Sequence, residues 1–236
     1  MKRLFPIVIV IATIITYSSL TLAQTQEAVK PPPKMLEFQM ALLKRGPKWT
    51  PPVAGDVIYR QHVDYVLSLL KSGQVVIAGP IKDESDLTGI YILRAKSADE
   101  ARAWVMADPA VAAERLVPEL HPWWSEDVMK KTDTPQKFMT AYLAFLVKGD
   151  KWTAEKTPQT EEIQKGHMAN IHRLADMKKL VVAGPFGDDG RLRGIFVFRV
   201  DSLDEARNLT QTDPAVQAGR LALELHPWLV PEGILP

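Results

Sequence analysis

The sequence contains no cysteine, and this absence excludes several kinds of chemistry at once. Without a thiol the protein can form no disulfide, no thiolate metal site, no cysteine nucleophile and no lipoprotein-type lipid attachment. Net charge is nearly absent as well, because the formal charge is +1 and no block of basic side chains occurs. We therefore expect no nucleic-acid partner, since proteins that bind nucleic acids normally present a basic surface.

The sequence also lacks the short motifs of several large enzyme classes. It has no P-loop, no glycine-rich dinucleotide fingerprint and no Gly-x-Ser-x-Gly nucleophile elbow. We therefore expect no cofactor, and the partner that we expect is a small-molecule ligand or substrate.

Long apolar runs are missing everywhere except at the N-terminus. Lys2 and Arg3 precede an almost unbroken apolar run from Leu4 to Ala23, which is typical of a secretory signal peptide. We expect residues 1–23 to be cleaved, residues 24–34 to form a polar lead-in, and the mature protein to be periplasmic or secreted without stable membrane association. Because the run approaches the roughly 20 residues that span a bilayer, an uncleaved anchor is the alternative.

What the chain does contain is an internal repeat. Ala-Gly-Pro at residues 78–80 recurs at 183–185, and Asp-Pro-Ala-Val at 108–111 recurs at 213–216. Glu-Leu-His-Pro-Trp at 119–123 returns at 224–228 with the same offset. A fixed offset over several motifs indicates two copies of one domain. The predicted bounds are 35–124 for the first domain, 125–135 for a linker, 136–230 for the second domain and 231–236 for a C-terminal tail.

Each copy predicts the element order βαββαβ. The expected strands and helices of the first copy are a strand at 38–43, a helix at 56–71, strands at 75–78 and 89–94, a helix ending at 108 and a strand at 115–121. The second strand is expected to stop before Gly79-Pro80, since proline cannot donate to a central ladder. Ser97 and Ser202 are expected to cap the second helices in capping boxes with Glu100 and Glu205.

This order is typical of an α+β, ferredoxin-like fold. Along the last strand of the first copy, Leu116, Pro118 and Leu120 point to one face, while Glu119, His121 and Trp123 point to the other. The first face suits packing under helices. The second face is mixed, as expected if it closes against a partner sheet. We therefore predict that the two repeats pair sheet to sheet within one chain, as an intramolecular pseudo-dimer.

Several motifs together carry a family resemblance. A histidine near the start of the first helix, Gly-Pro after the second strand, Asp-Pro after the second helix and a closing Pro-Trp occur in this order in both copies. This combination resembles the YciI-like (YCII-related) family. The resemblance implies a ferredoxin-like fold of the dimeric α/β-barrel kind and a His–Asp active site. It also implies small-molecule chemistry, since some members are enzymes such as a dehydrochlorinase acting on chlorinated hydroxyquinols.

Carried over residue by residue, the resemblance implies two catalytic dyads, His62 with Asp108 and His167 with Asp213. Imidazole titrates near neutral pH, so each histidine could act as a general base, although a half-buried structural histidine is the alternative. Asp-Pro is also a favoured way to begin a short helix, so capping is a second role for both aspartates. Where the family usually has Asp-Pro-Phe, this chain has Asp-Pro-Ala, so a pocket wall made by that phenylalanine is not implied.

Further candidates for ligand binding come from matched positions in the two copies. Glu119 with His121, and Glu224 with His226, lie two apart on a strand and share a face, where interface contacts or a cavity lining are expected. Two ligands per copy fall short of a metal site, so no metal is predicted. Arg115 and Arg220 could hold an anion or form surface ion pairs. Trp49 and Trp152 could cover a pocket or anchor a loop.

Two functions remain open from the sequence. One is a lyase or isomerase that uses the His–Asp dyad for proton transfer, and the other is a binding module with the same pocket and no turnover. The loops at 82–86 and 187–191 differ between the copies. Because loops shape pockets, we predict two similar dyads in unlike pockets, with unequal affinity for one ligand.

Overall fold

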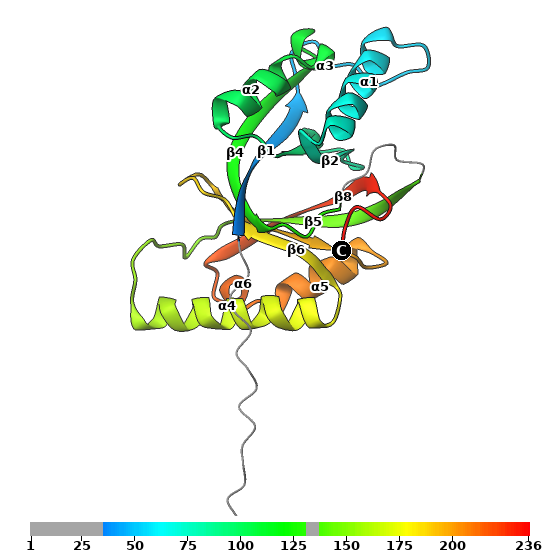
Figure 1. Cartoon of the computed structure of the whole chain (residues 1–236). Coiled ribbons are helices and arrows are strands. Elements are labelled where there is room, and N and C mark those ends of the chain that lie inside the picture. Colours follow the sequence, from blue (N-terminus) through cyan, green and yellow to red (C-terminus); the bar gives the residue numbers. More distant parts are fainter. Residues whose placement is uncertain (1–34, 131–136) are drawn as a thin grey trace, which may run out of the picture. The chain divides into compact units, whose positions relative to one another are not determined.

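A computed structural model describes residues 35–130 and 137–236 (Figure 1). The predicted signal peptide and lead-in lie outside the described residues, as do residues 131–135 of the predicted linker. The first repeat consists of β1 (Met35–Arg45), α1 (Val57–Ser72), β2 (Val75–Pro80), β3 (Leu87–Leu93), α2 (Ala98–Met106), α3 (Pro109–Ala112) and β4 (Leu116–Glu126). The second consists of β5 (Phe138–Lys148), α4 (Pro158–Asp176), β6 (Leu180–Pro185), β7 (Leu192–Phe198), α5 (Leu203–Gln211), α6 (Pro214–Gln217) and β8 (Leu221–Pro231).

Each repeat folds into one four-stranded antiparallel sheet. The strand orders are β2-β3-β1-β4 and β6-β7-β5-β8, so the two sheets have the same topology. Figure 1 shows α1, α2 and α3 together on one face of the first sheet, and α4, α5 and α6 together on one face of the second. The predicted ferredoxin-like fold is confirmed. Each copy adds a one-turn helix, α3 or α6, which begins at Asp-Pro.

The prediction that the second strand stops before Gly79-Pro80 is wrong. β2 continues through Pro80, which pairs with Gly89 of β3, and β6 likewise continues through Pro185. β2 and β6 are the edge strands of their sheets. A proline, which has no backbone N–H, can therefore stand in them without removing a hydrogen bond of the sheet's ladder. β1 and β4 are also longer than predicted, because their ladder pairs residues over all of β1.

The helix caps are partly as predicted. Ser97 and Ser202 accept hydrogen bonds from the backbone N–H groups of Glu100 and Glu205, both at 3.1 Å. The glutamate side chains do not return to the serine N–H groups. They accept from the N–H of the residue before each cap instead, at Lys96 and at Asp201. The reciprocal half of each predicted capping box is therefore displaced by one residue.

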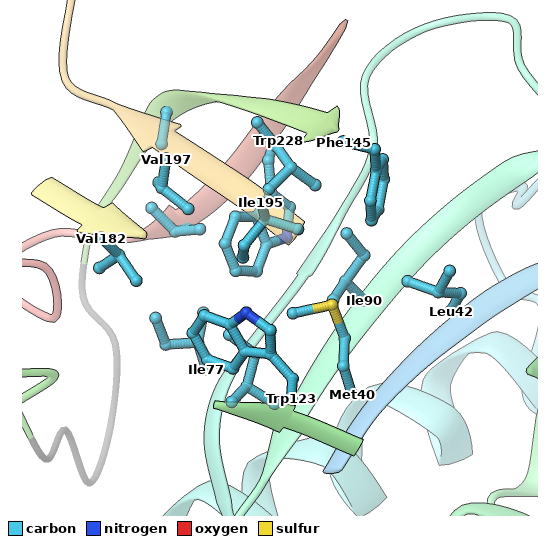
Figure 2. Close-up of a cluster of buried hydrophobic side chains, with 14 of the residues drawn as sticks. Met40, Leu42, Ile77, Ile90, Trp123, Phe145, Val182, Ile195, Val197 and Trp228 are labelled. Atoms are coloured by element: carbon cyan, nitrogen blue, oxygen red, sulfur yellow. The ribbon is translucent and has the colours of Figure 1, made fainter. Parts of the chain in front are cut away.

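The two repeats share a single apolar core between their sheets. Figure 2 shows Met40, Ile77 and Trp123 of the first repeat facing Val182, Ile195 and Trp228 of the second. Trp123 and Trp228 are fully buried, and each indole N–H donates across the interface, to the carbonyls of Gly184 and Gly79 at 3.1 Å. The predicted sheet-to-sheet pseudo-dimer is confirmed.

Backbone pairing also joins the repeats. The N–H of Lys82 donates to Pro227 at 2.8 Å, and the N–H of Gly187 donates to Pro122 at 2.7 Å. Isolated β-bridges join Ile81 to Trp228 and Trp123 to Phe186. The end of β4 therefore meets the end of β6, and β8 meets β2 in the same way.

The segments predicted as linker and tail also contribute to packing. β4 ends at Glu126, inside the predicted linker, and Met129 is buried in the shared core. At the other end of the chain, Ile234 and Leu235 are buried in the same core. None of the helices within the described ranges is long and apolar enough to span a membrane.

Candidate functional site

The first repeat brings His62 and Asp108 into direct contact. α1 begins after Asp56, which caps the helix, and this places His62 in its second turn. Asp108 caps α3 by accepting from the N–H of Ala110 at 2.8 Å. Nδ1 of His62 lies 2.9 Å from both carboxylate oxygens of Asp108. The Asp-Pro motif therefore starts a helix and holds a histidine at the same time.

The Asp108 contact decides which nitrogen of His62 is free. A carboxylate only accepts hydrogen bonds, so Nδ1 carries the hydrogen and Nε2 is left as the acceptor. Nε2 has no hydrogen-bond partner among the described residues. Asp108 is completely buried, whereas the His62 side chain remains 18% exposed. The arrangement therefore presents one basic nitrogen and shields the group that orients it.

Tyr91 completes this site, although none of the repeated sequence motifs includes it. Its hydroxyl donates to Oδ2 of Asp108 at 2.6 Å. Burial, together with the neighbouring charge of Asp108, raises the pKa of Tyr91 well above its ordinary value, so the hydroxyl stays protonated. Along β3, Ile90 and Ile92 face the other repeat, so the alternate residue Tyr91 faces the helices. That alternation is the sequence feature from which the position of Tyr91 on the helix-covered face could have been predicted.

A cavity of about 650 Å³ adjoins His62. Its lining is largely apolar and includes Trp49, Tyr59 and Ala110 of the first repeat. Phe138, Leu229 and Pro231 of the second repeat close another part of the wall. A volume of this size suits a small organic molecule.

The second repeat has the same dyad with different neighbours. Nδ1 of His167 lies 2.7 Å from Oδ2 of Asp213, which is fully buried and caps α6 through the N–H of Ala215. Phe196 stands where the first repeat has Tyr91, and its ring stacks on His167 at 5.9 Å between centroids. Asn170 approaches Asp213 at 3.4 Å in place of a tyrosine hydroxyl. The dyads match, but only the first has a phenolic donor.

The two arginine candidates have different surroundings. Arg115 forms an ion pair with Asp56, and its hydrogen bond lowers the pKa of that carboxyl group. Arg220 donates instead to the backbone carbonyl of Thr153 at 2.9 Å, and its guanidinium lies 5.2 Å from the ring centroid of Trp152. Arg115 and Trp49 line the His62 cavity, while Arg220 and Trp152 belong to the second repeat.

The Glu–His candidates lie at the junction of the repeats and do not line the His62 cavity. Nδ1 of His121 lies 2.6 Å from Asp188, and Nδ1 of His226 lies 2.7 Å from Asp83, so each histidine contacts a loop of the other repeat. The glutamates contact cations: Glu119 pairs with Lys44, and Glu224 with Arg191. Within residues 35–130 and 137–236, no group of three or more acidic or histidine side chains is arranged to hold a metal.

The His226–Asp83 contact predicts an acid-sensitive contribution to stability. Burial alone would raise the pKa of Asp83, but hydrogen bonds from Ser85 and His226 outweigh it, and the pKa is lowered. Because the pKa of Asp83 is lower in the folded protein than in the unfolded chain, the ionised carboxylate stabilises the fold above the unfolded carboxyl pKa of about 4. This stabilisation is lost as the pH falls through the pKa of the folded state. We expect Asp83→Asn to cost about 1 kcal/mol at pH 7 and progressively less below about pH 4. Urea unfolding across this range checks it, and a pH-independent cost would contradict it.

Comparison with known proteins agrees with these motifs. The family model described as YCII-related domain matches residues 38–120 and 141–228, which is more than half of the chain. The chain belongs to the YCII-related family. A relative from Bacillus subtilis (strain 168), the uncharacterized protein YjpA, is 31% identical over 90 residues, which are 38% of this chain and 95% of that protein. The relative is therefore about as long as a single repeat.

Solved structures resemble this YCII-related chain over both repeats. A mutant chlorite dismutase from Candidatus Nitrospira defluvii matches with a TM-score of 0.54 and 13% identity, covering 84% of this chain and 92% of that one. The same enzyme in complex with imidazole gives a TM-score of 0.54 and 12% identity with the same coverage. At this identity the likeness supports the fold alone, that of a dimeric α/β barrel built from two ferredoxin-like halves.

Proposed function

We propose that the first repeat is a cofactor-independent proton-transfer site that acts on a small, largely apolar molecule as a lyase or isomerase. One observation carries this proposal. The buried Asp108 holds Nδ1 of His62 at 2.9 Å, while Nε2 is unpartnered among the described residues and His62 lines the cavity. A histidine oriented in this way is suited to act as a general base.

Each residue then has a defined role. Nε2 of His62 takes a proton from a carbon or hydroxyl group of the bound molecule, and Asp108 stabilises the imidazolium that forms. The hydroxyl of Tyr91 donates a hydrogen bond to Oδ2 of Asp108 and so keeps the carboxylate oriented toward His62. In an isomerase the proton returns to another atom of the same molecule. In a lyase a leaving group departs instead, and the proton is released afterwards.

The experiment begins with a thermal-shift screen of the intact protein against small, largely uncharged organic molecules. Molecules that raise the melting temperature are then incubated with the protein, and product formation is followed by mass spectrometry. We expect His62→Gln to lower kcat/KM by about 10²- to 10⁴-fold, the usual contribution of a general base. His172→Gln changes a histidine outside both dyads and serves as the matched control. Turnover that survives His62→Gln unchanged would exclude the proposed base.

A ligand-binding module without turnover is the second candidate. The observation that favours it concerns the acidic groups of the cavity lining, Asp56 and Asp83. Both are already engaged, Asp56 by Arg115 and Asp83 by His226, so no unpaired carboxyl group among them is left to act as an acid. Saturable binding that His62→Gln weakens, without any chemical change of the ligand, is the result expected from this candidate.

We also propose that the protein is exported. The support is the sequence at the N-terminus, where Lys2 and Arg3 precede the apolar run that ends at Ala23. N-terminal sequencing of periplasmic or secreted material is expected to begin near Gln24. Full-length protein found solely in the cytosol would contradict export, and full-length protein in the membrane fraction would favour the uncleaved anchor.

A further inference from the structure

The second repeat gathers three cations around Trp152. The guanidinium of Arg193 lies 4.9 Å from the ring centroid, that of Arg220 lies 5.2 Å away, and the ammonium of Lys148 lies 5.9 Å away. In the first repeat a single cation, Arg45, is found within this range of Trp49, at 5.6 Å. The equivalent tryptophans therefore have different electrostatic surroundings.

No carboxylate among the described residues neutralises these three cations. Each donates to a backbone carbonyl instead: Lys148 to Asp189 at 2.8 Å, Arg193 to Asp188 at 3.0 Å, and Arg220 to Thr153 at 2.9 Å. Nη1 of Arg220 is buried and has no hydrogen-bond partner among the described residues. A buried guanidinium nitrogen without an acceptor is costly, and an anion would supply the missing acceptor.

Residue differences between the repeats explain the excess of positive charge. Arg115 pairs with Asp56, the residue that caps α1, whereas α4 is capped by the neutral Thr157. Thr88 precedes Gly89 on β3, and Arg193 takes the corresponding place before Gly194 on β7. Compared with the first repeat, the second repeat thus lacks one carboxylate and has an additional guanidinium at the corresponding site.

We propose that the second repeat binds a small anion, a carboxylate or a phosphate group of a ligand, at Arg193 and Arg220 beside Trp152. Guanidinium groups match both anions with paired N–H donors, and the half-buried setting strengthens each contact. Trp152 holds the two guanidinium groups near each other through cation–π contacts. The first repeat, whose Arg115 is already paired with Asp56, takes an uncharged molecule. This inference does not depend on proton transfer in the first repeat.

Isothermal titration calorimetry on the intact protein tests the proposal with three probes: inorganic phosphate, benzoate and the neutral benzamide. We expect phosphate or benzoate to bind and benzamide not to bind at this site. Binding of phosphate alone or of benzoate alone identifies which anion is the ligand group. The variants Arg193→Thr, which installs the residue of the first repeat, and Arg220→Gln are each expected to weaken anion binding at least about tenfold.

Two controls keep the result interpretable. Arg207→Gln removes an exposed arginine of α5, and Arg102→Gln removes the exposed arginine at the matching position of α2. Both are expected to leave the anion affinity within about twofold of wild type, because their charges lie outside the cluster. Circular dichroism confirms that each variant is folded. If neither anion binds, or if the variant that carries both Arg193→Thr and Arg220→Gln binds as well as wild type, the proposal is overturned.

Discussion

Gly79→Ala is expected to destabilise the protein by about 3 kcal/mol or more, because the new methyl group has no space. Its Cβ would lie 1.8 Å from the carbonyl oxygen of Leu229 and 3.2 Å from Nε1 of Trp228. Leu229 belongs to β8 of the other repeat and pairs with Thr140, so its backbone cannot move without disturbing the ladder. The hydrogen bond from Trp228 to the carbonyl of Gly79 would be strained as well.

The second repeat provides an internal replicate of this test. A Cβ on Gly184 would lie 1.8 Å from the carbonyl oxygen of Trp124, so Gly184→Ala is expected to have a similar effect. Gly55→Ala is the control, because nothing lies within 4 Å of its Cβ and only its φ of +85° resists the change. That strain costs about 1 kcal/mol. Urea unfolding measures the free energy of unfolding of all three variants. If the Gly79→Ala variant were as stable as the Gly55→Ala variant, close packing of the repeats at Gly79 would be contradicted.

Asp108→Ala is expected to cost about 3 kcal/mol, since one buried carboxylate serves three partners. The substitution removes the cap of α3 at Ala110, and it leaves Nδ1 of His62 and the hydroxyl of Tyr91 without an acceptor. The cap alone is worth about 1 kcal/mol, and each buried group left unsatisfied adds about 1 kcal/mol or more. The aspartate is thus expected to matter for folding as well as for orienting the histidine.

Tyr91→Phe is the matched control for the aspartate. The second repeat already has Phe196 at this position, so the change preserves packing and removes the short hydrogen bond to Asp108, worth about 1 kcal/mol, with the longer 3.4 Å contact to His62. Denaturant unfolding of the two variants side by side gives the comparison. Equal losses from Asp108→Ala and Tyr91→Phe would show that the other two contacts of Asp108 contribute little.

The two repeats differ in the residues that surround the His–Asp pairs. Both keep the histidine and the buried aspartate, but Phe196 stands in place of Tyr91, and Arg220 donates to a backbone carbonyl where Arg115 pairs with Asp56. Two similar dyads in unlike pockets remain a prediction, and these differences motivate its test. Separate calorimetric titrations of His62→Ala and His167→Ala with one ligand test it. Equal loss of affinity from both variants would contradict unequal pockets.

The sequence by itself determined the repeat, the order of elements and the fold. These features rest on motifs at a fixed offset and on local periodicity, which a single strand or helix expresses without its neighbours. The alternating faces of the last strand predicted the sheet-to-sheet contact for the same reason. The His62–Asp108 and His167–Asp213 pairs followed from the family resemblance, and the structure brings both pairs within hydrogen-bond distance.

Only the tertiary structure decided which partners these residues have. His121 meets Asp188 across 67 positions of the chain, and His226 meets Asp83 across 143, and both aspartates lie in loops of the opposite repeat. Loop residues have no hydrophobic periodicity from which such pairings could be predicted. The role of Tyr91 could not be predicted for a similar reason. A tyrosine in an apolar strand is common, and only the folded structure places His62 of α1 and Asp108, the cap of α3, beside it. Contacts between elements far apart in sequence depend on how the layers close, and that is settled only when the whole chain has folded.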